Sequence, residues 1–513
     1  MSILLGIDLG TSGVKVLAME SAGKILAITT RSYPLYQPRA GWSEQEPEDW
    51  WTGVVGAIRD LLQQDPVDAN AVKGLAVSGQ MHGSVFLDDH HQVIRRPLLW
   101  NDTRTYPQCQ TMTETIGEEQ LIQLAGNPAL EGFTAPKVLW LKAHEPEHYD
   151  RLATLLLPKD YILFRLTGRL CTEVSDAAGT LLFDVRNRQW SQQMMDLLDL
   201  NPSMLPEVLE SPDIVGSLTE EAASATGLSP ATQVIAGGAD NACSAVGNGI
   251  VSEGLVLASL GTSGTVVAHS DEMKMDPHGR IHSFNHAIPN RWYLMGVMLS
   301  AAASFQWFRE NFAEAETLLA RSLPDSADQL LNREAETVPP GSEGVIFLPY
   351  LSGERTPHRD AKARGAFIGL APVHTKKHLT RAIMEGVAFG MRDSLELVKG
   401  LGVTPTQIRI TGGGAKSPLW RQIVADVFNH PVVTTNIEEG PAIGAALLAG
   451  VGVGIFKEVE DAVREIVEIT DTTSPNDSNA EVYENLYPLY RHLYRSLKSD
   501  FAEAFDILER LNA

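Results

Sequence analysis

Apolar runs separated by short glycine-rich segments are the leading pattern along this chain. The apolar runs Ile3–Ile7 and Leu255–Ala258 are each followed, after such a segment, by a second apolar run, Val14–Leu17 and Thr265–Ala268. β-prone residues on both sides of a short glycine turn are typical of a β-hairpin. The sequence therefore predicts one hairpin near its start and another about half its length later.

The remaining elements alternate between strands and helices. Apolar residues at helical spacing, such as Trp50, Val54 and Ile58, predict amphipathic helices. Further strands are expected over 24–33, 72–78, 84–87, 344–351 and 407–411, and before Gly237. Helices are expected over 50–62, much of 103–125, 136–145, 158–166, 242–249, 377–398, 418–428 and 442–449, and from about 300. This alternation predicts an α/β protein.

Two segments near the end of the chain are interpreted differently. The polar stretch 471–476 is expected to be a linker. The tail beyond it has apolar residues at helical spacing, from Leu486 to Leu508, and is expected to be a helix packed on its own domain.

Length indicates two domains. The chain has 513 residues, more than the ~250–300 at which a single core usually divides. The hydrophobic fraction of 44% provides enough apolar side chains for two cores. The distance between the two predicted hairpins places the domains at 1–251 and 252–513.

Charge and cysteine content restrict partners and location. The formal net charge is −23, which repels nucleic acid and anionic membranes. The three cysteines, Cys109, Cys171 and Cys243, form neither a disulfide framework nor a zinc motif. We see no signal segment, and no apolar run approaches the ~20 residues needed to span a bilayer. A soluble cytoplasmic protein is expected.

A six-residue phrase is repeated in the turns of the two hairpins, as Asp8–Gly13 and Ser259–Gly264. Glycines let a ligand approach the backbone, and free N–H groups and hydroxyls in such turns can hold phosphate oxygens. The copies differ at their first position, where Asp8 is replaced by Ser259. This difference suits a nucleotide clamp with two phosphate-binding turns and one metal-facing carboxylate. The alternative is two ordinary hairpin turns.

A third glycine-rich segment, Gly412–Ala415, lies between a predicted strand and a predicted helix. It suits the close approach of an adenosine, although glycine turns in this context are also common. The chain has neither the G-x-x-x-x-G-K-[ST] phosphate loop nor a G-x-G-x-x-G segment after the first strand with an acidic ribose ligand. Two common nucleotide-binding folds are therefore disfavoured.

Asp240 is the candidate general base. It follows Gly237-Gly238 at the expected carboxyl end of a strand, where α/β proteins place ligands. Phosphoryl transfer needs a carboxylate within reach of the accepting hydroxyl. Asp8 is the second carboxylate and is expected to orient Mg²⁺ through water. The alternative for Asp240 and Asn241 is a helix cap or Asx turn.

The segment Gln80–Gly83 follows a predicted buried strand. His82 either is a core imidazole or contributes to a site that hydrogen-bonds sugar hydroxyls. Lys15 either reaches phosphate or is solvated at the edge of its strand.

The sequence resembles the FGGY carbohydrate kinases, within the actin-like, sugar-kinase and Hsp70 ATPase superfamily. The resemblance covers about residues 1–450 and is carried by phrases along the whole of that range. These phrases are 6–15, 79–83, 99–102, 132–137, 157–161, 175–180, 237–241, 259–264, 349–358, 365–385 and 412–415.

The resemblance implies a fold and a set of site residues. The implied fold is a duplicated, ribonuclease-H-like α/β ATPase fold in which ATP and sugar bind between two lobes that close over them. Asp240 matches the family's base, and Asp8 matches its metal-and-phosphate aspartate. The implied sugar contacts are Met81, His82, Asp240 and Asn241. The implied ATP contacts are Gly10, Thr11, Ser12, Lys15, Gly261, Thr262, Ser263, Gly413, Gly414 and Ala415.

The resemblance also implies an activity. The Gln80–Gly83 phrase is similar to that of family members that phosphorylate xylulose, which implies Mg·ATP-dependent phosphorylation of D-xylulose at O5. Other members of the same family act on ribulose, gluconate, fuculose, erythritol or glycerol, and these substrates remain open. A homodimer is a family-level expectation. The alternative from another class is a non-catalytic actin-like or chaperone ATPase.

Overall fold

The structure is a computed structural model that describes residues 2–512, apart from the side chains of 509 and 512. Contacts divide the chain into two compact units. The first unit holds the residues up to Ser252 together with His269–Tyr293 and Glu439–Glu468; the second holds the rest. The sequence-based border at 251/252 lies beside the first change of unit. The contacts nevertheless do not follow two continuous halves, because two later segments return to the first unit. As a border between family domains, 251/252 stays a prediction.

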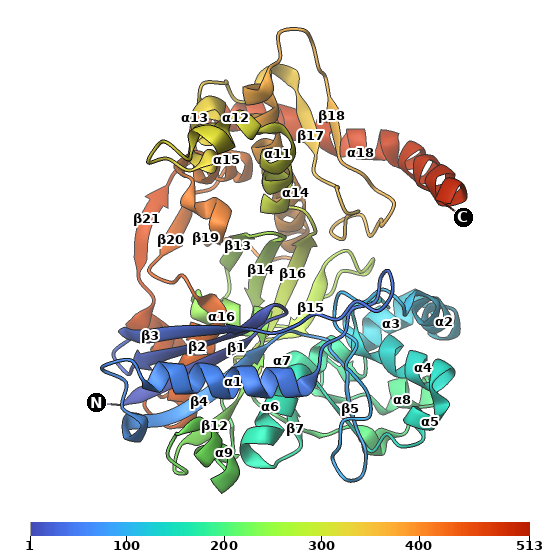
Figure 1. The fold of residues 1–513 in the computed structure, drawn as a ribbon. Helices are drawn as coiled ribbons and strands as arrows, with labels where there is room; N and C mark the ends of the chain where they lie inside the picture. The colour runs from blue at the N-terminus through green and yellow to red at the C-terminus, as the bar shows by residue number, and fades with distance from the viewer. Residues whose placement is uncertain (1, 513) are drawn as a thin grey trace. The chain divides into compact units, whose positions relative to one another are not determined.

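A mixed six-stranded sheet forms the centre of the first unit. Its strands follow the order β11-β12-β4-β1-β2-β3 (Figure 1). They are β1 (Ile3–Leu9), β2 (Gly13–Glu20), β3 (Ile25–Ser32), β4 (Val72–Gly79), β11 (Ile214–Ser217) and β12 (Gln233–Ala239). β1 and β2 pair as the predicted hairpin, and β1, β4 and β12 run parallel. Their carboxyl ends therefore meet at one edge of the sheet.

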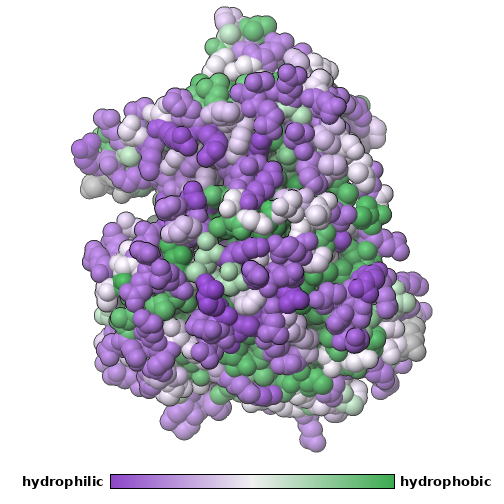
Figure 2. All heavy atoms as spheres, turned by 180° about the vertical axis from the view of Figure 1, so that it is seen from behind, coloured by the Kyte–Doolittle hydropathy of each residue, from purple (hydrophilic) through white to green (hydrophobic). Residues whose placement is uncertain are grey.

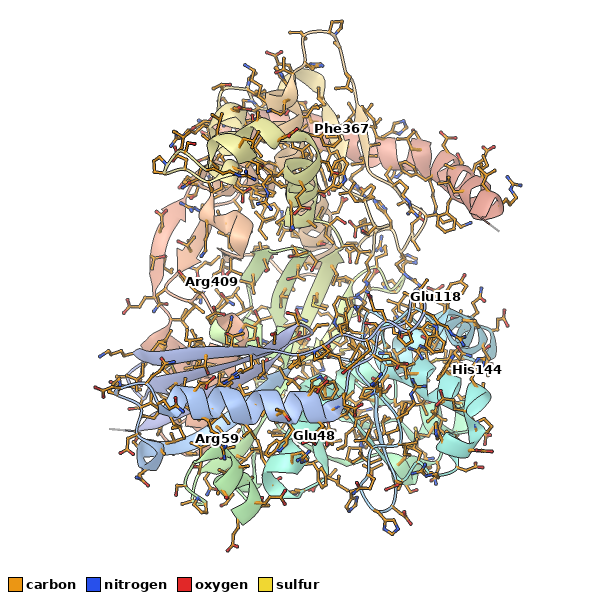
Figure 3. The ribbon with its side chains drawn as sticks, in the orientation of Figure 1. Glu48, Arg59, Glu118, His144, Phe367 and Arg409 are labelled. Carbon is orange, nitrogen blue, oxygen red and sulfur yellow. The ribbon has the colours of Figure 1, made fainter. Side chains whose placement is uncertain are left out.

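Helix α1 (Pro47–Leu62) packs on β2 and β3 of this sheet (Figure 1). Its buried apolar residues include Trp50, Val54 and Ile58, the stripe predicted from the sequence. Glu48 and Arg59 lie toward opposite ends of the helix (Figure 3). An acidic first turn and a basic last turn both complement the helix dipole.

Two helices of the first unit that are rich in small residues pack backbone to backbone. α16 (Gly440–Gly452) contacts β1, β4 and α10 (Asp240–Gly247). A Cβ atom added to Gly444 would lie 1.9 Å from the carbonyl oxygen of Cys243 in α10. One added to Gly6 in β1 would lie 1.8 Å from the carbonyl oxygen of Ala442 in α16. No side chain fits at these two positions. Glycine at both of them therefore allows α10, β1 and α16 to lie this close together.

The remaining elements of the first unit are helices and short strands. Its further helices are α2 (Tyr106–Ile116), α3 (Glu118–Ala125), α4 (Thr134–His144), α5 (Pro146–Tyr149), α6 (Pro158–Thr167), α7 (Val174–Ala177), α8 (Gln192–Leu197), α9 (Glu220–Thr226) and α17 (Val459–Ile466). Its further strands are β5 (Val85–Leu87), β6 (Thr154–Leu156), β7 (Cys171–Glu173), β8 (Phe183–Asp184), β9 (Gln189–Trp190), β10 (Glu207–Leu209) and β15 (His282–Asn285).

The second unit repeats the hairpin-plus-parallel-strand arrangement. β13 (Leu255–Leu260) pairs antiparallel with β14 (Gly264–Ser270) and parallel with β19 (Gln407–Thr411). The strands of this unit follow the order β16-β14-β13-β19-β20-β21 within their sheet, with β16 (Trp292–Met298), β20 (Val432–Thr435) and β21 (Ile469–Thr473). The expected linker at 471–476 is therefore wrong for its first residues, since Asp471–Thr473 belong to an edge strand paired with β20.

Helices and a small hairpin complete the second unit. They are α11 (Ala302–Phe312), α12 (Glu314–Leu319), α13 (Ala327–Glu336), α14 (Lys376–Gly400), α15 (Pro418–Phe428), α18 (Asp477–Asn512), β17 (Ile346–Leu348) and β18 (Ala366–Ile368). The predicted tail helix is α18, coloured red in Figure 1. Its tyrosines hold it on this unit: Tyr483 donates to Glu385 and Tyr487 to Asp393, both in α14.

The surface is mainly hydrophilic on the face drawn in Figure 2, with hydrophobic residues scattered among the polar ones. No helix in the described range 2–512 is both long and apolar enough to cross a membrane.

Candidate active site

The parallel strands β1, β4 and β12 bring the predicted first-unit residues to one edge of their sheet. Asp8 lies opposite Ser78 in the β1–β4 register, and Ala239 lies opposite Gly79 in the β12–β4 register. Met81 and His82 follow β4, and Asp240 and Asn241 begin α10 directly after β12. Two carboxylates and the candidate sugar contacts therefore come from neighbouring strand ends, where α/β sheets bind ligands.

Asp8 is half-buried, and its carboxylate accepts a hydrogen bond from the Ser78 hydroxyl at 3.2 Å. Desolvation raises the pKa of Asp8 to about 6, against the opposing effects of the Ser78 hydrogen bond and the Lys15 charge. Such a carboxylate gains from a nearby cation, because a positive charge stabilises its ionised form.

Asp240 starts α10 at a point where two strands approach very closely. A Cβ atom on Gly237 would lie 2.0 Å from the carbonyl oxygen of Val77, and Gly237 has a φ of +71°. Asn241 donates to Asp240 Oδ1 from its backbone N at 2.7 Å and from its side chain at 2.8 Å. Desolvation, followed by the charge of Asp8, raises the pKa of Asp240 to about 7. A carboxylate with a pKa near the working pH suits general base catalysis.

His82 is held by its backbone and by its ring. The residue has a φ of +71°, in the left-handed region. Its Nδ1 donates to the carbonyl oxygen of Gly179 at 2.6 Å, and its ring centroid lies 4.5 Å from that of Phe133. Met81 is buried, and its sulfur lies 3.8 Å from Asn241 Nδ2. The structure thus brings Met81, His82, Asp240 and Asn241 together, and their contact with sugar stays a prediction.

Sequence reasoning did not assign roles to two residues that support His82. Lys137 is fully buried and donates to the carbonyl oxygens of His82 at 2.8 Å and of Gly132 at 2.6 Å. Burial lowers the pKa of Lys137 to about 7. Gly179 supplies the acceptor for the His82 ring, and a Cβ atom there would lie 2.7 Å from Nδ1. The lysine could have been found through the phrase 132–137, whereas a backbone carbonyl leaves no signal in the sequence.

A buried ionic cluster lies in the same unit. Lys159 donates to Asp160 at 2.6 Å and lies 3.6 Å from Glu173 and 3.8 Å from Asp176, and all four side chains are inaccessible. Glu173 accepts hydrogen bonds from Ser175, Asp176 and Ser211 groups. Neither carboxyl oxygen of Asp176 has a hydrogen-bond partner within the described chain. Desolvation, opposed by the Lys159 charge, raises the pKa of Asp176 well above its usual range.

The first glycine turn is tied down by side chains. The carbonyl oxygen of Gly10 accepts a hydrogen bond from the Tyr33 hydroxyl, and that of Thr11 accepts one from Gln45 Nε2 at 2.6 Å. Ser12 is exposed, and within residues 2–512 neither its hydroxyl nor its backbone N–H makes a hydrogen bond. The predicted contact of Ser12 with phosphate stays a prediction.

Lys15 has a partner in the structure. Its ammonium forms an ion pair with Glu439, the residue before α16, and both side chains are about one-third exposed. Its predicted contact with phosphate stays a prediction.

The second glycine turn borders a cavity of about 820 Å³ in the second unit. Gly261 and Thr262 line it from the turn, and Gly413 and Gly414 line it from the predicted adenosine loop. Phe305, Pro418 and Trp420 provide apolar wall, and Arg309, Asp328 and Asn332 are among the polar lining residues. The predicted residues Ser263 and Ala415 do not line the cavity, and their nucleotide contacts stay predictions.

The glycines of the adenosine loop differ in the space around them. A Cβ atom on Gly413 would meet nothing within 4 Å, whereas one on Gly414 would lie 2.5 Å from the Leu260 side chain. Gly413 therefore faces open space beside the cavity, and Gly414 packs against β13. A cavity of this size that combines an apolar wall with polar side chains is typical of a small-molecule site.

The chemistry of the residues present fits a magnesium ion held in part by phosphate. No group of three or more His, Cys, Asp or Glu side chains in the described range could hold a metal alone. Mg²⁺ usually keeps several waters and binds through one or two carboxylates and substrate phosphates. A single carboxylate, Asp8, beside a turn that is predicted to bind phosphate meets that requirement.

Comparison with known proteins agrees with this arrangement. Residues 3–247 match the N-terminal domain of the FGGY family of carbohydrate kinases, and residues 256–453 match its C-terminal domain. The chain belongs to the FGGY family. The resemblance noted in the sequence, and with it the two-domain α/β fold, is confirmed. As a member of this family the protein is a carbohydrate kinase, for which ATP is the phosphate donor.

Individual FGGY relatives cover nearly the whole chain. It is 44% identical over 498 residues to the xylulose kinase of Bacillus subtilis, covering 97% of this chain and 98% of that one. A structure of a "xyloylose kinase" from Brucella ovis matches with a TM-score of 0.89 and 36% identity, covering 97% of this chain and 99% of that one. A gluconate kinase structure from Lactobacillus acidophilus matches with a TM-score of 0.91 and 28% identity, covering 98% and 99%.

Proposed function

We propose that this protein phosphorylates D-xylulose at O5 with Mg·ATP, giving D-xylulose 5-phosphate. The single observation that supports the substrate most strongly is the 44% identity, over nearly both full chains, to a xylulose kinase. The gathering of Met81, His82, Asp240 and Asn241 at the strand ends of the first unit supports the reaction type. A cytoplasmic, homodimeric enzyme is part of the proposal.

In the proposed mechanism, Asp240 accepts the proton of the sugar hydroxyl while the hydroxyl oxygen attacks the γ-phosphate. Asn241 holds the Asp240 carboxylate in place through its two hydrogen bonds. His82 and Met81 orient the sugar, and the fixed position of the His82 ring limits which hydroxyl patterns can bind. A site built on directed hydrogen bonds can reject analogues that lack one hydroxyl by large factors.

The glycine turns act on the phosphates. Free backbone N–H groups and the Ser12 hydroxyl stabilise the transferred phosphoryl group, whose charge is spread over its oxygens. Mg²⁺ bound at Asp8 would offset part of the phosphate charge. The apolar wall formed by Phe305 and Trp420 would hold the adenine.

A panel assay tests the substrate. ADP release is measured with Mg·ATP and D-xylulose, ribulose, gluconate, glycerol, fuculose or no sugar. Strong stimulation by D-xylulose alone supports the proposal. Stimulation by another sugar alone would replace the substrate and leave the family intact. Sugar-independent ATP turnover would favour a nucleotide-switched protein.

Replacing the base tests the mechanism. Asp240→Ala is expected to lower kcat by ~10²–10⁴, the usual range for loss of a general base. Asn248→Ala removes a polar side chain one residue beyond the other end of α10 and serves as the control for damage to this helix. Unchanged kcat in Asp240→Ala would refute the assignment.

Gluconate is the second candidate substrate. The gluconate kinase structure from Lactobacillus acidophilus has a TM-score of 0.91, as high as those of the xylulose kinases. Its lower identity, 28%, gives it less weight than the Bacillus relative. The same panel assay separates the two substrates.

A further inference from the structure

One buried polar atom in the wall of the second-unit cavity has no hydrogen-bond partner. Asn332 on α13 is half-buried and lines this cavity of about 820 Å³. Its Oδ1 is inaccessible to solvent and accepts no hydrogen bond within residues 2–512, and no other lining residue has such an atom in that range. An unpaired buried acceptor is unfavourable and needs an explanation. Here a ligand that occupies the cavity can supply the missing donor.

The start of α13 is fixed by the protein itself. The Ser326 hydroxyl accepts from the backbone N of Gln329 at 3.2 Å, and Gln329 Oε1 accepts from the backbone N of Ser326 at 2.7 Å. This capping box sets where the helix begins. Arg309 of α11 forms an ion pair with Asp328 at 2.9 Å. Residues three and four apart share one face of a helix, so Asp328 and Gln329 lie on the same side of α13 as Asn332, and all three line the cavity.

Helices α11 and α15 supply the apolar part of the cavity wall (Figure 1). The rings of Phe305 on α11 and Trp420 on α15 have centroids 5.5 Å apart. Trp420 is held in place because its Nε1 donates to the carbonyl oxygen of Met384 at 3.1 Å. An apolar wall can accept the flat face of any purine, so it contributes affinity without distinguishing one base from another. Distinguishing bases requires directed hydrogen bonds to the edge of the ring.

The amide of Asn332 has the groups that such a distinction needs. An asparagine side chain carries an acceptor oxygen beside a donor NH₂ group. The edge of adenine presents the complementary pair, the N6 amino donor beside a ring-nitrogen acceptor. The N6 amino group is also the one donor on the adenine base of a nucleotide. Guanine and hypoxanthine have a carbonyl oxygen at the same ring position, which can only accept and therefore cannot pair with Oδ1 there.

We propose that Asn332 is a base-specificity residue, whose Oδ1 accepts a hydrogen bond from the N6 amino group of adenine while Nδ2 donates to the adjacent ring nitrogen. Asn332 lies between the sequence phrases 259–264 and 349–358 and belongs to neither of them. Base selection is thus assigned to α13 and is separate from the close approach that the glycine loop allows. The inference rests on the proposed function only in placing the nucleoside of ATP in this cavity.

The affinity for nucleoside diphosphates, measured by calorimetry without sugar, tests the inference. The probes are Mg·ADP and the Mg complex of purine riboside 5′-diphosphate, which has a hydrogen atom in place of the amino group. The wild type is expected to bind ADP about 3- to 10-fold more tightly, as for one hydrogen bond. Asn332→Leu removes the amide at nearly constant volume and should bind the two nucleotides equally. Asn332→Asp keeps an acceptor and should retain a preference for ADP.

Asn311→Leu is the matched control. Asn311 is an exposed asparagine of α11 that does not line the cavity, and its side chain donates to the carbonyl oxygen of Trp307 at 2.8 Å. This variant should prefer ADP as strongly as the wild type does. Because the two nucleotides are compared within each variant, general damage to the cavity weakens both and leaves their ratio unchanged. Where Asn332→Leu does not fold, as judged from its urea unfolding curve, Asn332→Ala takes its place.

Several results would overturn the inference. The wild type would bind the two nucleotides equally, or Asn332→Leu would keep the preference for ADP. A third is that Asn332→Leu loses the discrimination against 2′-deoxy-ADP and keeps that against the purine riboside, which would place the ribose at Asn332. Failure of the wild type to bind either nucleotide would contradict the proposed function together with the inference. Since no sugar is present, failure of the xylulose assignment alone does not affect these measurements.

Discussion

Glu354 is a buried carboxyl whose protonation should be visible in the stability of the protein. Its side chain is 3% exposed, and its Oε1 accepts from the backbone N of Leu299 at 3.0 Å and of Arg355 at 2.7 Å. Oε2 has no hydrogen-bond partner within residues 2–512. Desolvation outweighs the two backbone hydrogen bonds and raises the pKa of Glu354 to about 8. The folded protein therefore carries a neutral Glu354 at pH 7.

The sign and size of the effect follow from linkage. A folded-state pKa above the unfolded value stabilises the protein fully below the unfolded pKa, and this stabilisation is lost as the pH rises through the folded pKa. The unfolded glutamate, with a pKa of about 4.3, has already lost its proton at pH 6. With a folded-state pKa of about 8 for Glu354, the protein therefore loses about 2.5 kcal/mol of unfolding free energy as the pH rises from about 6 to 9.

Glu354→Gln removes this titration and keeps the shape. The variant is expected to lose about 2.5 kcal/mol less unfolding free energy than the wild type between pH 6 and pH 9. Urea unfolding followed by tryptophan fluorescence at several pH values measures the difference, and Glu336→Gln, at an exposed position of the same unit, is the control. Parallel pH profiles for wild type and Glu354→Gln would refute the reasoning, because Glu354 would then be ionised in the folded protein.

Four further substitutions test the site. Gly413→Ala should raise the KM for ATP without changing the urea midpoint of unfolding. Gly414→Ala should instead destabilise the protein by ~1–3 kcal/mol through overlap with β13. The opposite pattern would show that the nucleotide does not bind beside Gly413. Gly179→Ala should displace the His82 ring and raise the KM for the sugar more than that for ATP, and equal changes in both would contradict this. Asp176→Asn should change the unfolding free energy at pH 7 by less than about 1 kcal/mol; a loss of about 3 kcal/mol or more would show an ionised carboxylate paired with the buried lysine.

Local patterns predicted the elements that carry the site. The two hairpins and the helix α14 follow from glycine turns and from apolar periodicity, and the structure confirms them. The strand ends that hold Asp8 and Asp240 were predictable for the same reason. Their distance from each other depends on how β1, β4 and β12 pair, which a single sequence does not display.

Two features escaped prediction for identifiable reasons. Asp471–Thr473 were interpreted as part of a linker because β21 is an edge strand whose residues are exposed or half-buried, so no alternation of apolar and polar residues marks it. The ion pair of Lys15 with Glu439 joins residues 424 positions apart. Nothing near either residue indicates that the chain returns to the first unit there.

The return of α16 to the first unit has a consequence for folding during synthesis. Domains generally fold as units as the chain emerges from the ribosome. Here the segment that packs its backbone against β1 and α10 is not made until residues 440–452 have been translated. The first unit therefore cannot complete its core until after most of the second unit has been synthesised, and its early strands must wait with their α16-facing surface uncovered.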